Sequence, residues 1–306
     1  MYHYVRERDG RLPNFVYLDV LNFKKQINWL SKSYRFVSQS EFYGSLASRK
    51  PIENGLVLTF DDGLSDHYEY VFPVLKDLGI WGIFYISTLP LVERRLLPVH
   101  KVHYMLGRFG GEAVLASLRS RLTESDYVPG CLERFRDSVY LKQSTSDAVR
   151  EVKTIVNYYL RPEIKDKILS DLMADFSENE AQVAGEYYMS KEQLVELRNC
   201  GFTIGSHAHT HNLLANLNDD EQTHECRRSL EILEPLIGSV ETFCFPYGGV
   251  NSYNSKTMQI LRRSGIVFSF SVESRDITSD DLGGGRLELP RYDCNEFEYG
   301  HPSGLI

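Results

Sequence analysis

The sequence lacks the patterns that mark several large classes of protein. Its five cysteines are odd in number, widely scattered and free of any Cys-x-x-Cys pair. This argues against a disulfide framework or a thiolate zinc site and is typical of a reducing compartment. No apolar run approaches the roughly 18 residues that a membrane-spanning helix needs. Lys and Arg number 34 against 42 Asp and Glu, so the net charge of −8 predicts no basic surface for nucleic acid.

The N-terminal residues 1–15 also lack the apolar stretch of a secretory signal. We therefore expect a cytoplasmic protein whose contact with a membrane, if any, is peripheral. Of its 306 residues, 42% are hydrophobic and 25% are charged, which is the composition of an ordinary globular chain with a real core. Intrinsic disorder is excluded as a description of the whole chain.

Short apolar runs alternate with amphipathic stretches, as in parallel β/α proteins. The runs are rich in β-branched and aromatic residues, which predicts strands buried on both faces. We expect strands at 55–60, 81–86, 202–206, 242–245 and 266–270. We expect helices at about 22–31, 66–78, 190–200, 219–236 and 252–264. Gly79 and Gly265 follow two of these helices, where glycine is preferred.

The stretch at about 89–185 interrupts this rhythm. It contains helix-like segments such as 112–121 and 146–159 but no clean strand. Its composition does not differ enough from the rest of the chain to indicate an independent core. We interpret it as a helical insertion in a single domain that spans residues 1–306.

A pair of carboxylates, Asp61 and Asp62, directly follows the apolar run 55–60 and precedes Gly63. Two adjacent acids at the end of a buried strand oppose each other's ionisation and are costly to desolvate. A bound cation would relieve this conflict, with one carboxylate as its ligand and the other as a base. The alternative is a simple turn and helix cap before Asp66.

A second polar cluster, GSHAHTH at 205–211, follows the run 202–206. His207 and His211 share one face of a helical turn, and all three histidines share a face if the segment is extended. Imidazole nitrogens suit Zn²⁺ and related ions, and two histidines with one carboxylate form a common catalytic set. The alternative is a solvated loop with histidines that bind nothing.

Three motifs together resemble those of a known enzyme family. TFDDG at 59–63, SHAHTH at 206–211 and FCFPYG at 243–248 are similar, in order and rough spacing, to the first three motifs of the NodB-homology polysaccharide deacetylases, carbohydrate esterase family four. MYHYV at 1–5 resembles the circularly permuted branch typified by poly-N-acetylglucosamine deacetylases, in which a Tyr-His element precedes the TFDDG strand. The resemblance covers residues 1–88 and about 186–295. It implies a distorted (β/α) barrel with fewer than eight regular units and a site at the carboxyl ends of the strands.

The resemblance also implies a role for each residue of the first two motifs. Asp61 would be the general base, while Asp62, His207 and His211 would bind a divalent metal, for which we expect Zn²⁺. His209 would lie between the two ligands without binding the metal.

Three further residues would complete the site. His3 matches the catalytic acid of the permuted branch, and its alternative is a histidine with a purely structural role. The backbone N–H of Tyr247 would face the oxyanion. The third motif here has Cys244 and Phe245 where the better-known branch carries an arginine that holds the base. Arg291 is our candidate for that missing arginine, and an ordinary surface arginine is the alternative.

These roles predict a metal-dependent N-deacetylase that releases acetate from an N-acetylated amino sugar. Expected substrates are a sugar nucleotide or a lipid-linked saccharide in surface-polysaccharide assembly. Two alternatives stay open: an amidohydrolase of a non-sugar or cyclic amide, and a glycan-binding protein without activity. A glycine-rich phosphate loop and a nucleophile elbow are both absent, so an acyl-enzyme route has no support.

Overall fold

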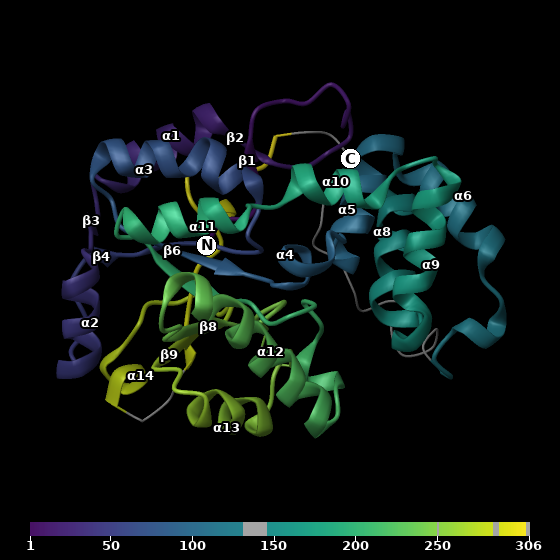
Figure 1. The fold of residues 1–306 in the computed structure, drawn as a ribbon. Coiled ribbons are helices and arrows are strands. Elements are labelled where there is room, and N and C mark those ends of the chain that lie inside the picture. The colour runs from purple at the N-terminus through teal and green to yellow at the C-terminus, as the bar shows by residue number, and fades with distance from the viewer. Residues whose placement is uncertain (131–145, 250, 284–287, 304–306) are drawn as a thin grey trace. The chain divides into compact units, whose positions relative to one another are not determined.

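The predicted apolar runs form consecutive strands of one parallel sheet. The computed structural model describes residues 1–130, 146–249, 251–283 and 288–303 (Figure 1). Neighbouring strands of the sheet are parallel and run in the order β10-β9-β8-β7-β6-β5. These strands are β5 (Leu58–Phe60), β6 (Gly82–Ile86), β7 (Thr203–Ser206), β8 (Thr242–Cys244), β9 (Phe268–Phe270) and β10 (Glu288–Leu289). Each strand lies beside the next one in the chain, and the sheet curls into the distorted (β/α) barrel that was predicted.

The structure refines two of these predictions. The predicted strand 55–60 is interrupted at Val57: β4 (Gly55–Leu56) pairs with β3 (Arg35–Phe36) in a separate sheet, and β5 begins at Leu58. β10 was not predicted, because a two-residue strand carries too little pattern to distinguish it from a loop.

The N-terminal residues extend the sheet beyond β5. Tyr2 forms a parallel bridge with Phe60. The Tyr2 N–H donates to the Thr59 carbonyl at 2.8 Å, and the Asp61 N–H donates to the Tyr2 carbonyl at 3.0 Å. The chain then continues into β1 (Val5–Arg6), which pairs with β2 (Leu18–Asp19). This register brings the third residue of the chain to the edge at which β5 ends.

Helices surround the sheet (Figure 1). They are α1 (Val20–Leu30), α2 (Gln39–Ser48), α3 (Phe72–Leu78), α4 (Leu89–Glu93), α11 (Lys191–Asn199), α12 (Asp219–Ile237), α13 (Ser255–Arg263) and α14 (Ser279–Gly283), with short turns η1 (His67–Val71), η4 (Leu214–Asn216) and η5 (Cys294–Glu296). Both α11 and α12 pack on β7, so the middle of the sheet is covered by apolar side chains. The five helices predicted for this part are confirmed to within a few residues. None of the helices in the described ranges combines the length and apolar character needed to cross a membrane.

The core explains why the strands are short and apolar throughout. Every residue of β6 is buried, and the Tyr85 hydroxyl lies 2.7 Å from Thr242 Oγ1 on β8. Tyr85 also passes so close to Gly205 that a Cβ atom there would lie 2.4 Å from its ring. Glycine is therefore required just before the histidine motif, because any side chain would push β6 and β7 apart.

The chain divides into two compact units. The first comprises Met1–Glu7, Leu18–Glu93 and Glu186–Pro302, and it contains the sheet. The second comprises Arg8–Tyr17, Arg94–Gly185 and residues from 303 onward. Its helices are α5 (Pro98–Phe109), α6 (Gly111–Arg121), α8 (Asp147–Thr154), α9 (Pro162–Asp175) and the start of α10 (Glu180–Tyr187), with turns η2 (Glu124–Asp126) and η3 (Ile155–Tyr159).

The second unit corresponds closely to the predicted insertion, and its described part is helical as expected. Residues 131–145 of the predicted insertion, including Cys131, lie outside the described residues. That the whole chain folds as a single domain stays a prediction.

Candidate metal centre and active site

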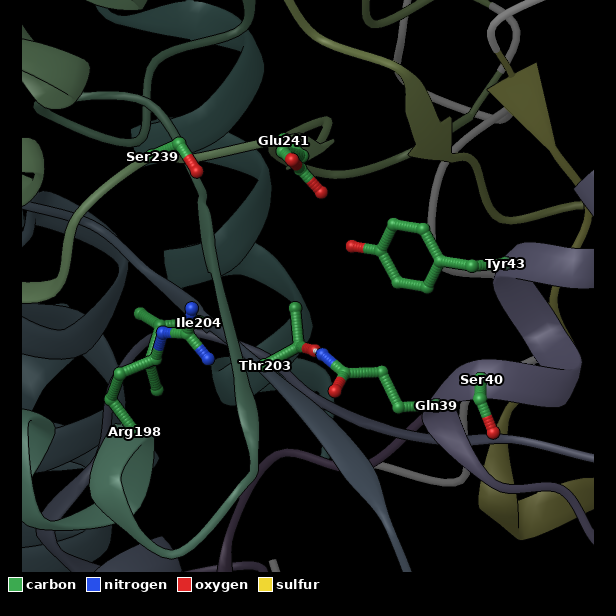
Figure 2. Close-up of a pocket in the computed structure, with 8 residues that line it drawn as sticks. All are labelled: Gln39, Ser40, Tyr43, Arg198, Thr203, Ile204, Ser239 and Glu241. Atoms are coloured by element: carbon green, nitrogen blue, oxygen red, sulfur yellow. Dashed lines mark hydrogen bonds between the residues drawn. The ribbon is translucent and has the colours of Figure 1, made fainter. Parts of the chain in front are cut away.

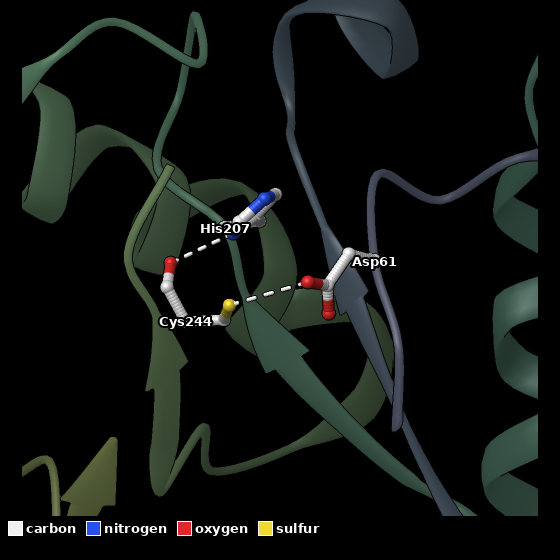
Figure 3. A group of neighbouring side chains, drawn as sticks. All are labelled: Asp61, His207 and Cys244. Carbon is white, nitrogen blue, oxygen red and sulfur yellow. Dashed lines mark hydrogen bonds between the residues drawn. The ribbon is translucent and has the colours of Figure 1, made fainter. Parts of the chain in front are cut away.

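Side chains from four strand ends meet at the carboxyl edge of the sheet. Asp61 and Asp62 follow β5, the histidine motif follows β7, the Phe-Pro-Tyr segment follows β8 and Arg291 follows β10. Parallel strands all end at the same edge, so residues far apart in the chain come together there. Figure 3 shows Asp61, His207 and Cys244 converging from three of these strands.

Asp62, His207 and His211 form one compact group of donors. The Asp62 Oδ1 atom lies 3.4 Å from Nε2 of His207 and 3.4 Å from Nε2 of His211. All three side chains are buried, and their donor atoms lie within 4.8 Å of one another. Two imidazole nitrogens and one carboxylate oxygen at these separations match the donor set that Zn²⁺ and similar cations prefer.

The orientation of His207 also fits a metal ligand. Its Nδ1 atom lies 2.7 Å from the carbonyl oxygen of Cys244 (Figure 3). A carbonyl can only accept a hydrogen bond, so Nδ1 carries the proton and donates. In the neutral ring Nε2 then keeps its lone pair, which faces Asp62. Metal-binding histidines are usually fixed in this way through their other ring nitrogen.

Asp61 is held by an arginine. Arg291 donates through Nη1 to Asp61 Oδ1 and through Nη2 to Oδ2, each at 2.8 Å. Burial alone would raise the pKa of Asp61, but the Arg291 guanidinium outweighs burial and brings the pKa well below its usual range. Asp61 is therefore an ionised carboxylate whose position is fixed by a two-pronged contact.

Arg291 is itself tightly fixed. Its side chain is 5% exposed, and it donates to the Ser271 carbonyl at 3.2 Å and to Thr59 Oγ1 at 2.9 Å. Its Nη2 atom lies 2.9 Å from Cys244 Sγ, so the cysteine of the third motif contacts the arginine from β10. The structure thus places Arg291 in the interior rather than on the surface.

Asp61, His207 and Cys244 form a second group of possible metal ligands with the same close spacing. This group already faces a cation, because the guanidinium of Arg291 contacts both carboxylate oxygens of Asp61 and the sulfur of Cys244. A metal ion there would have to displace Arg291 or lie against its charge. The group of Asp62, His207 and His211 is therefore the better candidate for the metal centre.

The other predicted residues lie around this centre. His3 follows Tyr2, the residue paired with Phe60, and contributes to lowering the pKa of Asp61 after the larger effect of Arg291. The ring centroid of Tyr247 lies 5.0 Å from that of His211. His209 turns away from the donor group, with its Nδ1 atom 2.9 Å from Thr88 Oγ1.

Several residues with a strained backbone lie at the same edge. Asp62, Ala208, His211 and Tyr247 have positive φ values of 79°, 62°, 60° and 63°. This left-handed conformation is unfavourable for residues with a Cβ atom, by roughly 1–2 kcal/mol each. Such residues tend to cluster where a fold holds functional groups in position. Here the metal-ligand candidates Asp62 and His211, and Tyr247 of the third motif, each lie in such a strained turn.

The comparisons with known proteins agree with this geometry. A family model described as polysaccharide deacetylase matches residues 173–269, which include the histidine motif and the Phe-Pro-Tyr segment. This stretch of the chain is similar to the polysaccharide deacetylase family. Members of this family are carbohydrate de-N-acetylases, hydrolases that depend on a metal. Among curated proteins, no sequence matches this chain.

Solved structures share the fold of this chain over most of its length. The Streptococcus pyogenes deacetylase PplD in complex with acetate is 16% identical, with a TM-score of 0.57 over 95% of this chain and 89% of that one. A de-N-acetylase from Aggregatibacter actinomycetemcomitans is 15% identical, with a TM-score of 0.53 over 95% and 92%. IcaB from Ammonifex degensii is 18% identical, with a TM-score of 0.51 over 88% and 81%.

Two residues that support the site were missed in the sequence. The Glu225 carboxylate accepts hydrogen bonds from the backbone N–H groups of His209 and Thr210, at 3.1 and 2.8 Å, and from the Thr210 hydroxyl at 2.6 Å. It therefore fixes the loop that carries the histidines. A charged residue next to Cys226 on the apolar face of α12 is the signal that could have identified it. His67 is the other residue, and its local sequence offers no such signal.

A separate cavity of about 290 Å³ lies at the opposite edge of the sheet (Figure 2). It is lined by Thr203 at the start of β7, Glu241 just before β8, Tyr43 on α2 and Arg198 on α11. None of the predicted site residues lines this cavity. The predicted carboxylates and histidines meet instead at the carboxyl edge.

Proposed function

We propose that this protein is a polysaccharide deacetylase that removes acetate from an N-acetylated amino sugar. The observation that carries the proposal is the convergence of Asp62, His207 and His211 on one point, beside an ionised Asp61 held by Arg291. A metal-binding group next to a separate, fixed base is an arrangement that supports hydrolysis of an unactivated amide.

Each group of residues at the site has a separate role in the reaction. A divalent cation held by Asp62, His207 and His211 would supply Lewis acidity that polarises the amide carbonyl and makes water more acidic. Asp61 accepts a proton from the attacking water, and the fixed contact with Arg291 keeps this carboxylate ionised and correctly oriented.

Two residues act on the developing charge and on the leaving group. The backbone N–H of Tyr247 donates to the oxyanion of the tetrahedral intermediate, and the strained turn at this residue sets its direction. His3 gives its proton to the nitrogen as the C–N bond breaks, because an amine anion is a very poor leaving group. The products are acetate and a free amino sugar.

We further propose Zn²⁺ as the metal and a cytoplasmic glycan precursor as the substrate. The Asp-His-His donor set supports zinc, since imidazole and carboxylate ligands in a buried site suit this ion. The four described cysteines form no disulfide, which supports a reducing compartment. A sugar nucleotide or a lipid-linked saccharide would carry an N-acetylated amino sugar and would be present in the cytoplasm.

The test pairs metal analysis with a screen for acetate release. The purified protein should contain about one equivalent of metal and should release acetate from N-acetylhexosamine nucleotides or oligosaccharides, but not from cyclic amides. Asp62→Ala should lose both metal and turnover, and Asp61→Asn should keep the metal but lose turnover. His209→Gln is the matched control and should keep the metal, because its ring contacts Thr88. Wild-type acetate release by Asp61→Asn would refute the proposal.

A further inference from the structure

A buried histidine, His67, holds the N-terminal segment that carries His3. The Nε2 atom of His67 lies 2.7 Å from the backbone carbonyl oxygen of His3. The neighbouring Tyr2 is fixed by its backbone to Thr59 and Asp61 of the β5 strand end. The next contact along this segment comes from His67. It is made to the carbonyl of the peptide bond between His3 and Tyr4.

The acceptor decides which nitrogen of His67 carries the proton. A carbonyl oxygen cannot donate, so Nε2 is protonated and donates the hydrogen bond. The ring is fully buried and packs on Phe60 and Phe84, with centroid distances of 5.5 and 6.0 Å.

The helix around His67 has an unusual turn that permits this placement. Residues His67–Val71 form a π turn, in which the Phe72 N–H donates to the His67 carbonyl five residues earlier. The following residue, Pro73, lacks the N–H that a regular α-helix would use at this point. The widened turn lies six residues after Asp61, and such turns occur frequently at functional sites.

The remaining nitrogen of His67 shows that packing is not the reason for a histidine here. Nδ1 is buried and has no hydrogen-bond partner among the residues that the structure describes. A buried acceptor left in this state destabilises a fold by roughly 1–3 kcal/mol. A phenylalanine would fill the same aromatic pocket without that cost. What phenylalanine cannot supply is the hydrogen bond to His3.

We propose that His67 is a positioning residue that holds His3 where it can protonate the leaving amine. The proposal rests on the role of His3 in the proposed function. Without the His67 hydrogen bond, the third peptide of the chain is anchored only through its neighbours, and the imidazole of His3 loses its fixed distance from the departing nitrogen. The proton moves from His3 to that nitrogen as the C–N bond breaks, so a displaced His3 slows this step alone.

The chemistry of the leaving group isolates this step. An aryl acetate such as p-nitrophenyl acetate releases an aryloxide that departs without a proton, whereas an N-acetyl sugar must release a protonated amine. Both substrates need the metal, the base Asp61 and the oxyanion contact. Only the amide needs His3. The ratio of amide to ester turnover therefore reports the position of the acid.

The experiment compares His67→Phe and His67→Gln with His3→Gln and Asp61→Asn on both substrates. His67→Phe should lower kcat for the amide by roughly 10- to 100-fold, part of the effect of a general acid, with little change in KM or in ester turnover. His67→Gln should restore most of the amide rate, because its amide N–H can reach the same carbonyl. His67→Phe should fold with an unchanged or higher Tm and bind the same amount of metal as the wild type.

A double variant separates positioning from general damage. In a His3→Gln background, His67→Phe should cause no further loss of amide turnover, because the acid it positions is already gone. A parallel fall of amide and ester rates, or equal losses in both backgrounds, would refute the role of His67. Normal amide turnover by His3→Gln would instead remove the acid from the proposed function, and absence of acetate release by the wild type would remove that function altogether.

Discussion

Removal of the arginine beside Asp61 should both destabilise the protein and change the pH dependence of its proposed activity. Arg291 and Asp61 form a buried pair, with side chains 5% and 3% exposed. Arg291→Met keeps the length and the apolar stem of the side chain but leaves the Asp61 carboxylate buried without its counter-charge. Breaking one partner of a buried pair costs about 3–5 kcal/mol, so we expect a loss of this size in the free energy of unfolding.

The same change should alter the ionisation of Asp61. In the wild type the guanidinium outweighs burial and keeps the pKa of Asp61 below its usual range. Without Arg291, burial acts alone and raises this pKa. The fraction of Asp61 that can accept a proton then falls as the pH drops, so the acid limb of the kcat profile should move to higher pH.

Arg275→Met is the matched control. Arg275 also contacts an aspartate through two nitrogens, with distances to Asp281 of 2.6 and 2.8 Å, but its side chain is 35% exposed. Asp281 is buried, but solvent reaches the Arg275 guanidinium and screens the pair, so Arg275→Met should cost less stability than Arg291→Met. Urea unfolding of both variants measures the loss of stability, and their pH–rate profiles measure the position of the acid limb. Equal stability losses with an unmoved acid limb in Arg291→Met would show that Asp61 does not depend on this arginine.

Three further outcomes follow from the structure. Removal of the metal with a chelator should lower the Tm of the wild type but not of Asp62→Ala, because a ligand that binds only the folded state stabilises it; equal shifts in a thermal scan would contradict the assigned centre. Burial lowers the pKa of His67 to about 4 from 6.5, so the unfolded chain binds a proton between these values that the folded chain does not. The free energy of unfolding should therefore fall by up to about 3 kcal/mol as the pH drops from 6.5 to 4, and urea titrations should show this slope flattened in His67→Phe. In the native protein, Cys200 is exposed and should react with an alkylating agent long before the buried Cys226 and Cys244, as peptide mass spectrometry would show.

Much of the fold could be predicted because its information is local. Continuously apolar runs of five or six residues identified the buried parallel strands, and amphipathic stretches with a glycine behind them identified the helices. The pairs Asp61-Asp62 and His207-His211 were recognisable for the same reason. Each directly follows a predicted strand, and parallel strands bring their carboxyl ends to one edge.

The contacts that hold these residues depend on distant parts of the chain, so the sequence could name a partner only as one of two alternatives. Arg291 was a candidate for the arginine beside Asp61, but the two are 230 residues apart and nothing near Arg291 distinguishes an arginine that enters the core from one on the surface. The hydrogen bond from His67 to the His3 carbonyl depends on a π turn and on the path of the N-terminal residues beside β5. Sequence by itself thus determined which residues are candidates for the chemistry and at which edge of the sheet they lie. Only the tertiary structure decided which side chain holds each of them in place, since that depends on how separate strands and turns pack in three dimensions.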